Sequence, residues 1–199
     1  MFAVLDYLGT FALGVTGASI GARIGMDFFG IVFLAFLTAV GGGTVRDLLI
    51  DQQVFWTNNS IYFYIIFLVC CLSFIVKDRL KKLSPVLFFL DTLGLGFYAI
   101  VGTQKTLTNG YGVTTALIMG VVSGVLGGII RSLFSKEVSI LYNKELYATI
   151  AGATSLIYIG LDSLDLNQYA AVFLTLGSSV TLRYLTIRYG IKLPKLKEN

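Results

Sequence analysis

Gly41-Gly42-Gly43-Thr44-Val45-Arg46-Asp47 lies near the end of an apolar run that covers Asp27–Ile50. A glycine inside a helix costs about 1 kcal/mol relative to alanine. An arginine that faces lipid near the bilayer centre costs at least about 2.5 kcal/mol. Three consecutive glycines do not form one packing face, so we predict that the helix unwinds here. Unwound backbone is tolerated inside a membrane only where it is buried or lines a water-filled path, so this stretch predicts a functional break in a membrane helix.

The stretch recurs once in the chain. A shift of 85 residues brings three of its residues onto identical ones. Gly42 matches Gly127, Gly43 matches Gly128, and Arg46 matches Arg131. The same shift aligns segment 5–62 with segment 90–147 without a gap, and it also matches Asp6 with Asp91, Gly9 with Gly94, Gly17 with Gly102, and Asn58 with Asn143. Each copy holds three apolar runs, and an odd number of crossings turns the second copy over. We therefore predict an inverted repeat, which recurs in proteins that move solutes through the bilayer.

Composition places the chain in a membrane. Its 199 residues are 56% hydrophobic and 13% charged, whereas a soluble domain is about 25% charged. Continuous apolar runs lack the alternation of a membrane β-barrel. The chain has no histidine, no CxxC spacing and no nucleophile motif, so we expect no enzyme activity, no metal site and no cofactor. The adjacent Cys70 and Cys71 are expected to pack within a helix.

Seven apolar runs are each close to the roughly 20 residues that a spanning helix needs. They cover Val4–Ala22, Asp27–Ile50, Ile61–Val76, Val86–Gln104, Gly112–Phe134, Leu146–Leu161 and Tyr169–Ile187. We predict an all-α integral membrane protein with seven transmembrane helices, of which the second and fifth are broken. The first three-helix repeat is expected over 1–84 and the inverted second repeat over 85–165. The seventh helix and a basic tail are expected over 166–199.

Basic residues indicate the orientation, because cytoplasmic loops are enriched in lysine and arginine. They gather after the third and the seventh run, at Lys77, Arg79, Lys81, Lys82, Arg188, Lys192, Lys195 and Lys197. Four runs separate the two groups, so both groups can be cytoplasmic and the N-terminus is expected outside. The net charge of +4 then reflects topology and contact with anionic lipid rather than nucleic-acid binding.

The two predicted breaks are candidates for a conduction path. Free backbone carbonyls at Gly41, Gly42 and Gly43, and at Gly127 and Gly128, could replace part of the hydration shell of a cation. Close helix packing is the competing interpretation of these glycines. Thr38 and Ser123, which the repeat relates, are expected to be polar groups of the wall.

The arginines one turn after the breaks are candidates for ion pairing or gating. Arg46 and Arg131 could pair with Asp47, Asp6 or Asp91, or act as a movable plug. The alternative is that each arginine extends to a lipid headgroup.

Several motifs resemble those of the trimeric intracellular cation channels (TRIC), and especially their prokaryotic members. The resemblance covers nearly the whole chain and is carried by 41–47, by Gly127-Gly128-Ile129-Ile130-Arg131, by Lys136-Glu137-Val138 and by 143–148. It implies a homotrimer with a pore for potassium and sodium in each protomer. It also assigns gating or block to Lys136, beside Glu137. The chain departs from the motif at Leu126, in place of a third glycine, and at Ser132, the counterpart of Asp47.

Two functions therefore remain open. The first is a passive channel for monovalent cations, with membrane lipids as further partners, in a prokaryotic inner membrane. The second is a secondary transporter for a small zwitterion such as an amino acid, whose carboxylate would bind at half-helix N-termini. A transporter usually has a paired acid inside the membrane for coupling. Asp6 and Asp91 could serve, although both are near helix ends.

Overall fold

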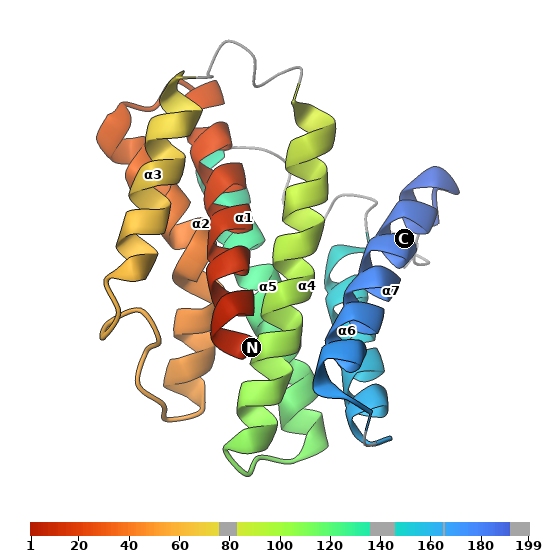
Figure 1. Ribbon diagram of the computed structural model, residues 1–199. Helices are drawn as coiled ribbons and strands as arrows, with labels where there is room; N and C mark the ends of the chain where they lie inside the picture. Colours follow the sequence, from red (N-terminus) through yellow and green to blue (C-terminus); the bar gives the residue numbers. More distant parts are fainter. Residues whose placement is uncertain (76–82, 136–145, 165, 192–199) are drawn as a thin grey trace, which may run out of the picture.

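The structure is a computed structural model that describes residues 1–75, 83–135, 146–164 and 166–191. Within these residues the chain forms only helices, and the predicted all-α fold with seven helices is confirmed (Figure 1). The helices are α1 (Phe2–Arg23), α2 (Phe28–Leu49), α3 (Ile61–Ile75), α4 (Ser84–Thr108), α5 (Val113–Ser135), α6 (Tyr147–Asp162) and α7 (Gln168–Arg188).

Length and apolar composition fit these helices to a membrane. Helices α1, α2, α4, α5 and α7 are each long and apolar enough to cross a bilayer. Helix α3 is apolar but has 15 residues, and α6 has 16. Many of the large exposed side chains are aliphatic or aromatic, as expected for a surface that faces lipid.

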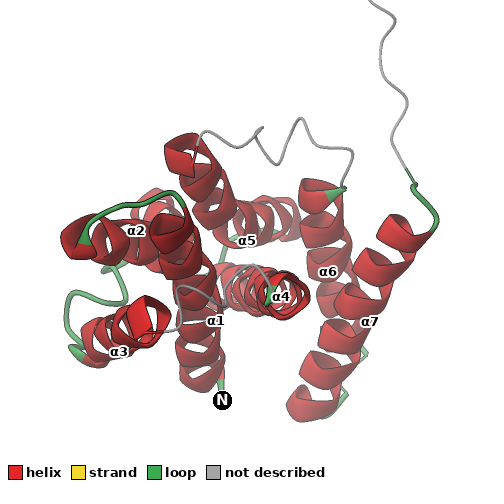
Figure 2. Ribbon diagram, turned by 90° about the horizontal axis from the view of Figure 1, so that it is seen from above, coloured by secondary structure: helices red, strands yellow, loops and turns green. Residues whose placement is uncertain are grey.

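Helices α1 and α4 lie side by side in the middle of the bundle (Figure 2). Helix α2 packs on α1 and α5, and α3 packs on α1 and α2 at one edge. On the other side α6 packs on α5 and α4, and α7 covers α4 and α6. Successive helices run in opposite directions (Figure 1), so α1 and α4 are antiparallel.

The predicted breaks in the second and fifth helices are wrong. Helix α2 is a continuous α-helix through Gly41, Gly42 and Gly43, and α5 is continuous through Gly127 and Gly128. An unbroken helix keeps every backbone hydrogen bond inside the segment, which is the favourable arrangement in lipid. Gly41, Gly42, Gly43 and Gly127 instead allow neighbouring groups to approach the helix backbone.

Contacts between α1 and α4 recur with the shift of 85 residues. Gly9 lies against the ring of Tyr98, and Gly94 lies against the side chain of Leu13. A Cβ atom on Gly9 would lie 2.9 Å from Tyr98 Cε2, and a Cβ atom on Gly94 would lie 2.6 Å from Leu13 Cγ. The shift relates Gly9 to Gly94 and Leu13 to Tyr98, so the two contacts are equivalent under it.

The ends of α1 and α4 also match. Each helix is followed by a glycine with positive φ, 79° at Gly25 and 82° at Gly110. Gly25 N–H donates to the carbonyl of Ala22, and Gly110 N–H donates to that of Leu107. In each case the next residue bonds back to the helix five residues earlier, which completes a Schellman cap.

Candidate functional site

Helices α2 and α5 cross at two reciprocal glycine contacts. Gly42 lies against the carbonyl oxygen of Ser123, and Gly127 lies against the carbonyl oxygen of Thr38. A Cβ atom at either glycine would overlap the opposing oxygen. The shift of 85 residues relates Gly42 to Gly127 and Thr38 to Ser123, so each helix supplies the same two elements. The structure brings these four predicted residues together at one closed crossing.

The other two glycines of the triplet serve different neighbours. A Cβ atom on Gly41 would lie 2.8 Å from Ile130 Cδ1 on α5. A Cβ atom on Gly43 would lie 2.6 Å from Cε1 of Phe55, which belongs to the loop between α2 and α3. The triplet therefore admits a side chain of α5, a carbonyl of α5 and an aromatic ring at three consecutive positions.

The hydroxyl groups at the crossing are enclosed by their own and neighbouring helices. Thr38 Oγ1 donates to the carbonyl of Leu34 at 2.7 Å, which keeps it on its own helix. Ser123 Oγ faces Gly102 of α4, and both Thr38 and Ser123 are fully buried.

One charged cluster lies at the C-terminal end of α2, and we name it the Asp47 cluster. Asp47 Oδ1 accepts from Arg46 Nε and from Lys105 Nζ of α4, each at 2.8 Å. Its Oδ2 accepts from the backbone N–H of Phe55 at 3.0 Å. Arg46 and Asp47 are fully buried, whereas the Lys105 side chain is 27% exposed. Arg46 therefore does not extend to a headgroup; it is part of a buried ion pair.

A second cluster, the Asp91 cluster, lies at the opposite end of the bundle, where α4 begins. Asp91 Oδ1 accepts from Arg131 Nη1 of α5 at 2.8 Å, and Oδ2 accepts from Arg183 Nη2 of α7 at 2.9 Å. Arg131 Nη1 also donates to Thr16 Oγ1 of α1 at 2.7 Å. The carboxylate of α4 thus connects directly to α5, α6 and α7, the contact to α6 being the hydroxyl of Tyr147 at 3.5 Å, and Arg131 extends the cluster to α1.

Arg183 is the residue of this cluster that lies outside the predicted repeat. Its guanidinium carbon lies 4.5 Å from the centroid of the Phe88 ring and 4.7 Å from that of Tyr147. Cation–π contacts of this kind stabilise a partly desolvated arginine. Sequence reasoning missed Arg183, although an arginine within an apolar run is a signal for a buried pair. It also missed the roles of Lys105 and Phe55.

The predicted acids differ in their partners. Asp47 and Asp91 pair with the predicted arginines. Asp6, the counterpart of Asp91, takes part in no ion pair among the described residues, and its Oδ1 is buried without a hydrogen bond there. Lys136 and Glu137 lie outside the described residues. Among the described part of the chain, no three His, Cys, Asp or Glu side chains gather as metal ligands would.

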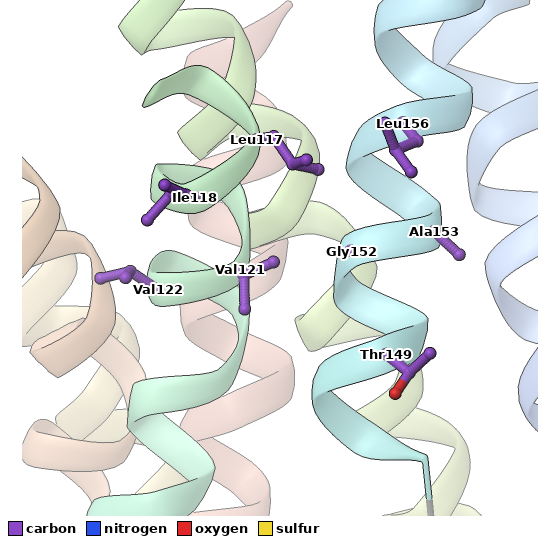
Figure 3. A pocket seen from close by; sticks show the side chains of 8 residues that line it. All are labelled: Leu117, Ile118, Val121, Val122, Thr149, Gly152, Ala153 and Leu156. Atoms are coloured by element: carbon purple, nitrogen blue, oxygen red, sulfur yellow. The ribbon is translucent and has the colours of Figure 1, made fainter. Parts of the chain in front are cut away.

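An apolar groove lies between α5 and α6, with a volume of about 490 Å³. Figure 3 shows its lining, which comprises Leu117, Ile118, Val121, Val122, Thr149, Gly152, Ala153 and Leu156. Thr149 is the one hydroxyl residue among them, so the groove suits hydrocarbon rather than an ion.

A family model described as "Glycine transporter" matches the chain twice, over residues 3–78 and 88–163. The chain is 31% identical over 193 residues to a "UPF0126 membrane protein" of Vibrio cholerae, covering 96% of this chain and 81% of the relative. It is 29% identical over 193 residues to the "UPF0126 inner membrane protein YadS" of Escherichia coli, covering 96% of this chain and 93% of YadS.

Solved structures extend the similarity to the fold. The TRIC orthologue from Rhodobacter sphaeroides superposes with a TM-score of 0.89 at 30% identity, covering 96% of this chain and 98% of that one. A structure described by "conductance through TRIC cation channels" gives a TM-score of 0.87 at 28% identity. The match covers 100% of this chain and 98% of that one. These descriptions name channels rather than enzymes. The chain is thus a multi-pass membrane protein of the family that the glycine transporter model describes, and a prokaryotic member of the TRIC family.

Proposed function

We propose that this protein is a channel for monovalent cations, potassium and sodium, with a pore in each protomer of a homotrimer. The observation that carries the proposal is the similarity to TRIC channels over nearly the whole chain, at 30% identity and a TM-score of 0.89. That structure is described as a trimeric channel, which supports both the activity and the assembly.

The α2–α5 crossing is the proposed gate. The contacts of Gly42 and Gly127 with the opposing carbonyls support a tightly packed crossing, and on this proposal conduction requires α2 and α5 to separate or slide. The Asp47 and Asp91 clusters lie at opposite ends of the bundle and hold the helices that would move. Lys136 and Glu137 are proposed to act on gating from the segment that follows α5.

We propose residues 1–84 and 85–165 as the inverted repeats, and 166–199 as the seventh helix with its basic tail. The twofold match of the family model and the contacts that recur with a shift of 85 support this division. The proposed location is the prokaryotic inner membrane, with the N-terminus outside and the C-terminus in the cytoplasm. The Asp47 cluster then faces the outside.

Membrane lipids are proposed as partners in the α5–α6 groove. Its lining is almost entirely aliphatic, which matches an acyl chain.

Planar-bilayer recording of the purified protein tests the channel. We expect discrete current steps, and under a potassium chloride gradient a reversal potential close to the potassium equilibrium value. Chemical crosslinking of the same preparation should give a trimer. A silent bilayer together with saturable uptake of labelled glycine into liposomes would overturn the channel.

A second candidate function is transport of a small zwitterion. The description of the family model favours it, and so do the buried charges of Asp6 and Arg46. Substrate-dependent uptake that saturates, without current steps, would identify this function.

A further inference from the structure

Two buried groups of opposite charge in the Asp47 region have unused hydrogen-bonding capacity. Oδ1 of Asp6 and both Nη atoms of Arg46 are buried, and none of them has a hydrogen-bond partner among the described residues. Arg46 uses only Nε, which donates to Asp47. Burying a charged group without its full set of partners is unfavourable. A site of this kind is therefore built for something that supplies the missing bonds.

The two groups share one neighbourhood. Asp6 lies near the start of α1 and Arg46 near the end of α2, and these adjacent helices are antiparallel. On the Asp6 side, Thr10 Oγ1 donates to the backbone carbonyl of Asp6 at 2.8 Å and lies 2.9 Å from Tyr98 Oη of α4. The ring of Tyr7, the residue after Asp6, lies 5.1 Å from the ring of Tyr62 of α3, between centroids.

Aromatic rings enclose this neighbourhood. The Phe55 ring lies 4.8 Å from the Tyr62 ring and 6.4 Å from the Tyr98 ring, between centroids. The guanidinium carbon of Arg46 lies 5.7 Å from the Phe55 centroid. Phe55 is itself packed on Gly43, so there is little room for a ligand with a large side chain.

The other half of the molecule shows how the site arises. There Arg131 bonds directly to Asp91 at 2.8 Å, and the shift of 85 residues makes this the counterpart of an Arg46–Asp6 pair. In the first half Arg46 pairs with Asp47 instead. In the second half the counterpart of Asp47 is Ser132, which has no charge. The additional acid leaves the Asp6 carboxylate available.

We propose that Asp6 and Arg46 form a binding site for a compact zwitterion, with the ammonium group on Asp6 and the carboxylate on the Nη atoms of Arg46. The site deepens the second candidate function. A metal cation would satisfy only the carboxylate of Asp6, and a small anion would satisfy only the Nη atoms of Arg46. Two acids, Asp6 and Asp47, balance two bases, Arg46 and Lys105, so a ligand without net charge keeps the cluster neutral. Glycine is the smallest amino acid of this class.

Equilibrium binding of radiolabelled glycine to the purified, detergent-solubilised protein tests the site. We expect saturable binding that unlabelled glycine displaces. Ethylamine carries only the ammonium and acetate only the carboxylate, so neither should displace glycine at the same concentration. Leucine should displace it poorly, because of Phe55. This comparison uses the native chain and needs no variant to fold.

Variants then assign the residues. Asp6→Asn and Arg46→Lys should each weaken binding about tenfold or more, because each variant loses a charge-assisted hydrogen bond to glycine. Asp51→Asn, at an exposed residue just beyond the end of α2, is the matched control and should bind as the native chain does. Size-exclusion profiles and circular dichroism establish that each variant is folded.

Two results would overturn the site: no saturable glycine binding by the native chain, or a folded Asp6→Asn variant that binds glycine normally. Displacement by ethylamine or potassium chloride as strong as that by glycine would overturn the zwitterion in favour of a cation. Currents recorded from the same preparation separate this proposal from the channel. Cation currents without glycine binding reject only the site, and glycine binding without currents rejects only the channel.

Discussion

Arg46 forms its ion pair with the next residue in the chain, Asp47, at 2.8 Å, and both side chains are fully buried. Adjacent residues on a helix do not normally face each other. Here Lys105 and the backbone N–H of Phe55 donate further hydrogen bonds to the Asp47 carboxylate. The pair therefore depends on α4 and on the α2–α3 loop, and it links the end of α2 to both.

Replacing Gly42 with alanine should destabilise the α2–α5 crossing. The new methyl group would overlap the carbonyl of Ser123, and overpacking of this kind costs about 1–3 kcal/mol. We expect a lower thermal unfolding midpoint in detergent and altered flux. Gly177→Ala is the matched control, because nothing lies within 4 Å of its Cβ position on α7 and alanine favours a helix. Equal midpoints for Gly42→Ala and the native chain would show that the crossing yields without cost.

Asp91→Asn should be strongly destabilising. The substitution removes the charge that Arg131 and Arg183 share, and breaking a buried pair by removing one partner costs about 3–5 kcal/mol. Loss of the Arg183 bond should also loosen α7, which limited proteolysis would detect as earlier cleavage near that helix. Asp27→Asn is the control, since Asp27 caps α2 from an exposed position and asparagine caps equally well. A stable Asp91→Asn variant would mean that other contacts hold α7 in place.

Lys105→Gln should increase cation conductance if the Asp47 cluster lines the outer entrance. The side chain is partly exposed, and its loss leaves two acids against Arg46. Surplus negative charge at an entrance concentrates cations, most strongly at low salt. Single-channel conductance at low ionic strength measures the effect, with Arg23→Gln, at an exposed residue at the far end of α1, as control. Unchanged conductance would place Lys105 away from the ion path.

Lys136→Ala should change the voltage dependence of opening, because the family resemblance assigns gating or block to this lysine. Open probability recorded over a range of voltages measures it. Lys144→Ala, eight residues further along the sequence, is the control. Identical voltage curves for the native chain and Lys136→Ala would remove this lysine from the gating mechanism.

Cysteine labelling should reveal the orientation. In a chain with Cys70 and Cys71 replaced by alanine, Asp51→Cys should react with a membrane-impermeant thiol reagent from outside the cell. Arg23→Cys should react only after permeabilisation, because the two residues lie at opposite ends of the bundle. Both positions are exposed. The reverse pattern would invert the proposed topology.

The lengths of the apolar runs were sufficient to predict the helices. A continuous hydrophobic segment in a bilayer has few other ways than a helix to satisfy its backbone hydrogen bonds. The shift of 85 residues also relates residues that make equivalent contacts, such as Gly42 and Gly127 at the crossing. Asp91 was one of three acids expected as partners for the arginines, and it pairs with Arg131. These predictions rested on features that cost energy in lipid and so need a structural reason.

The predicted helix breaks failed because helix propensity was weighed without tertiary contacts. Each of the three glycines admits a different neighbour, and close packing offsets the propensity that glycine loses. The partners Lys105, Phe55 and Arg183 could not be found from the repeat, since none of them has a counterpart 85 residues away with the same chemistry. An arginine inside an apolar run marks Arg183 as a candidate for a buried pair, but its partner depends on how α7 packs on α4. The contacts of Lys105 and Phe55 likewise depend on how α4 and the α2–α3 loop pack on the end of α2.

The α2–α5 crossing has a consequence for how sequences of this fold can change over time. Thr38 and Ser123 offer their carbonyl oxygens to it, and every amino acid carries such an oxygen. Gly42 and Gly127 must lack a side chain for those oxygens to fit. The crossing therefore restricts one member of each contact to glycine and places no demand of its own on the side chain of the other, so substitutions at positions 38 and 123 are limited by their other neighbours and not by the crossing.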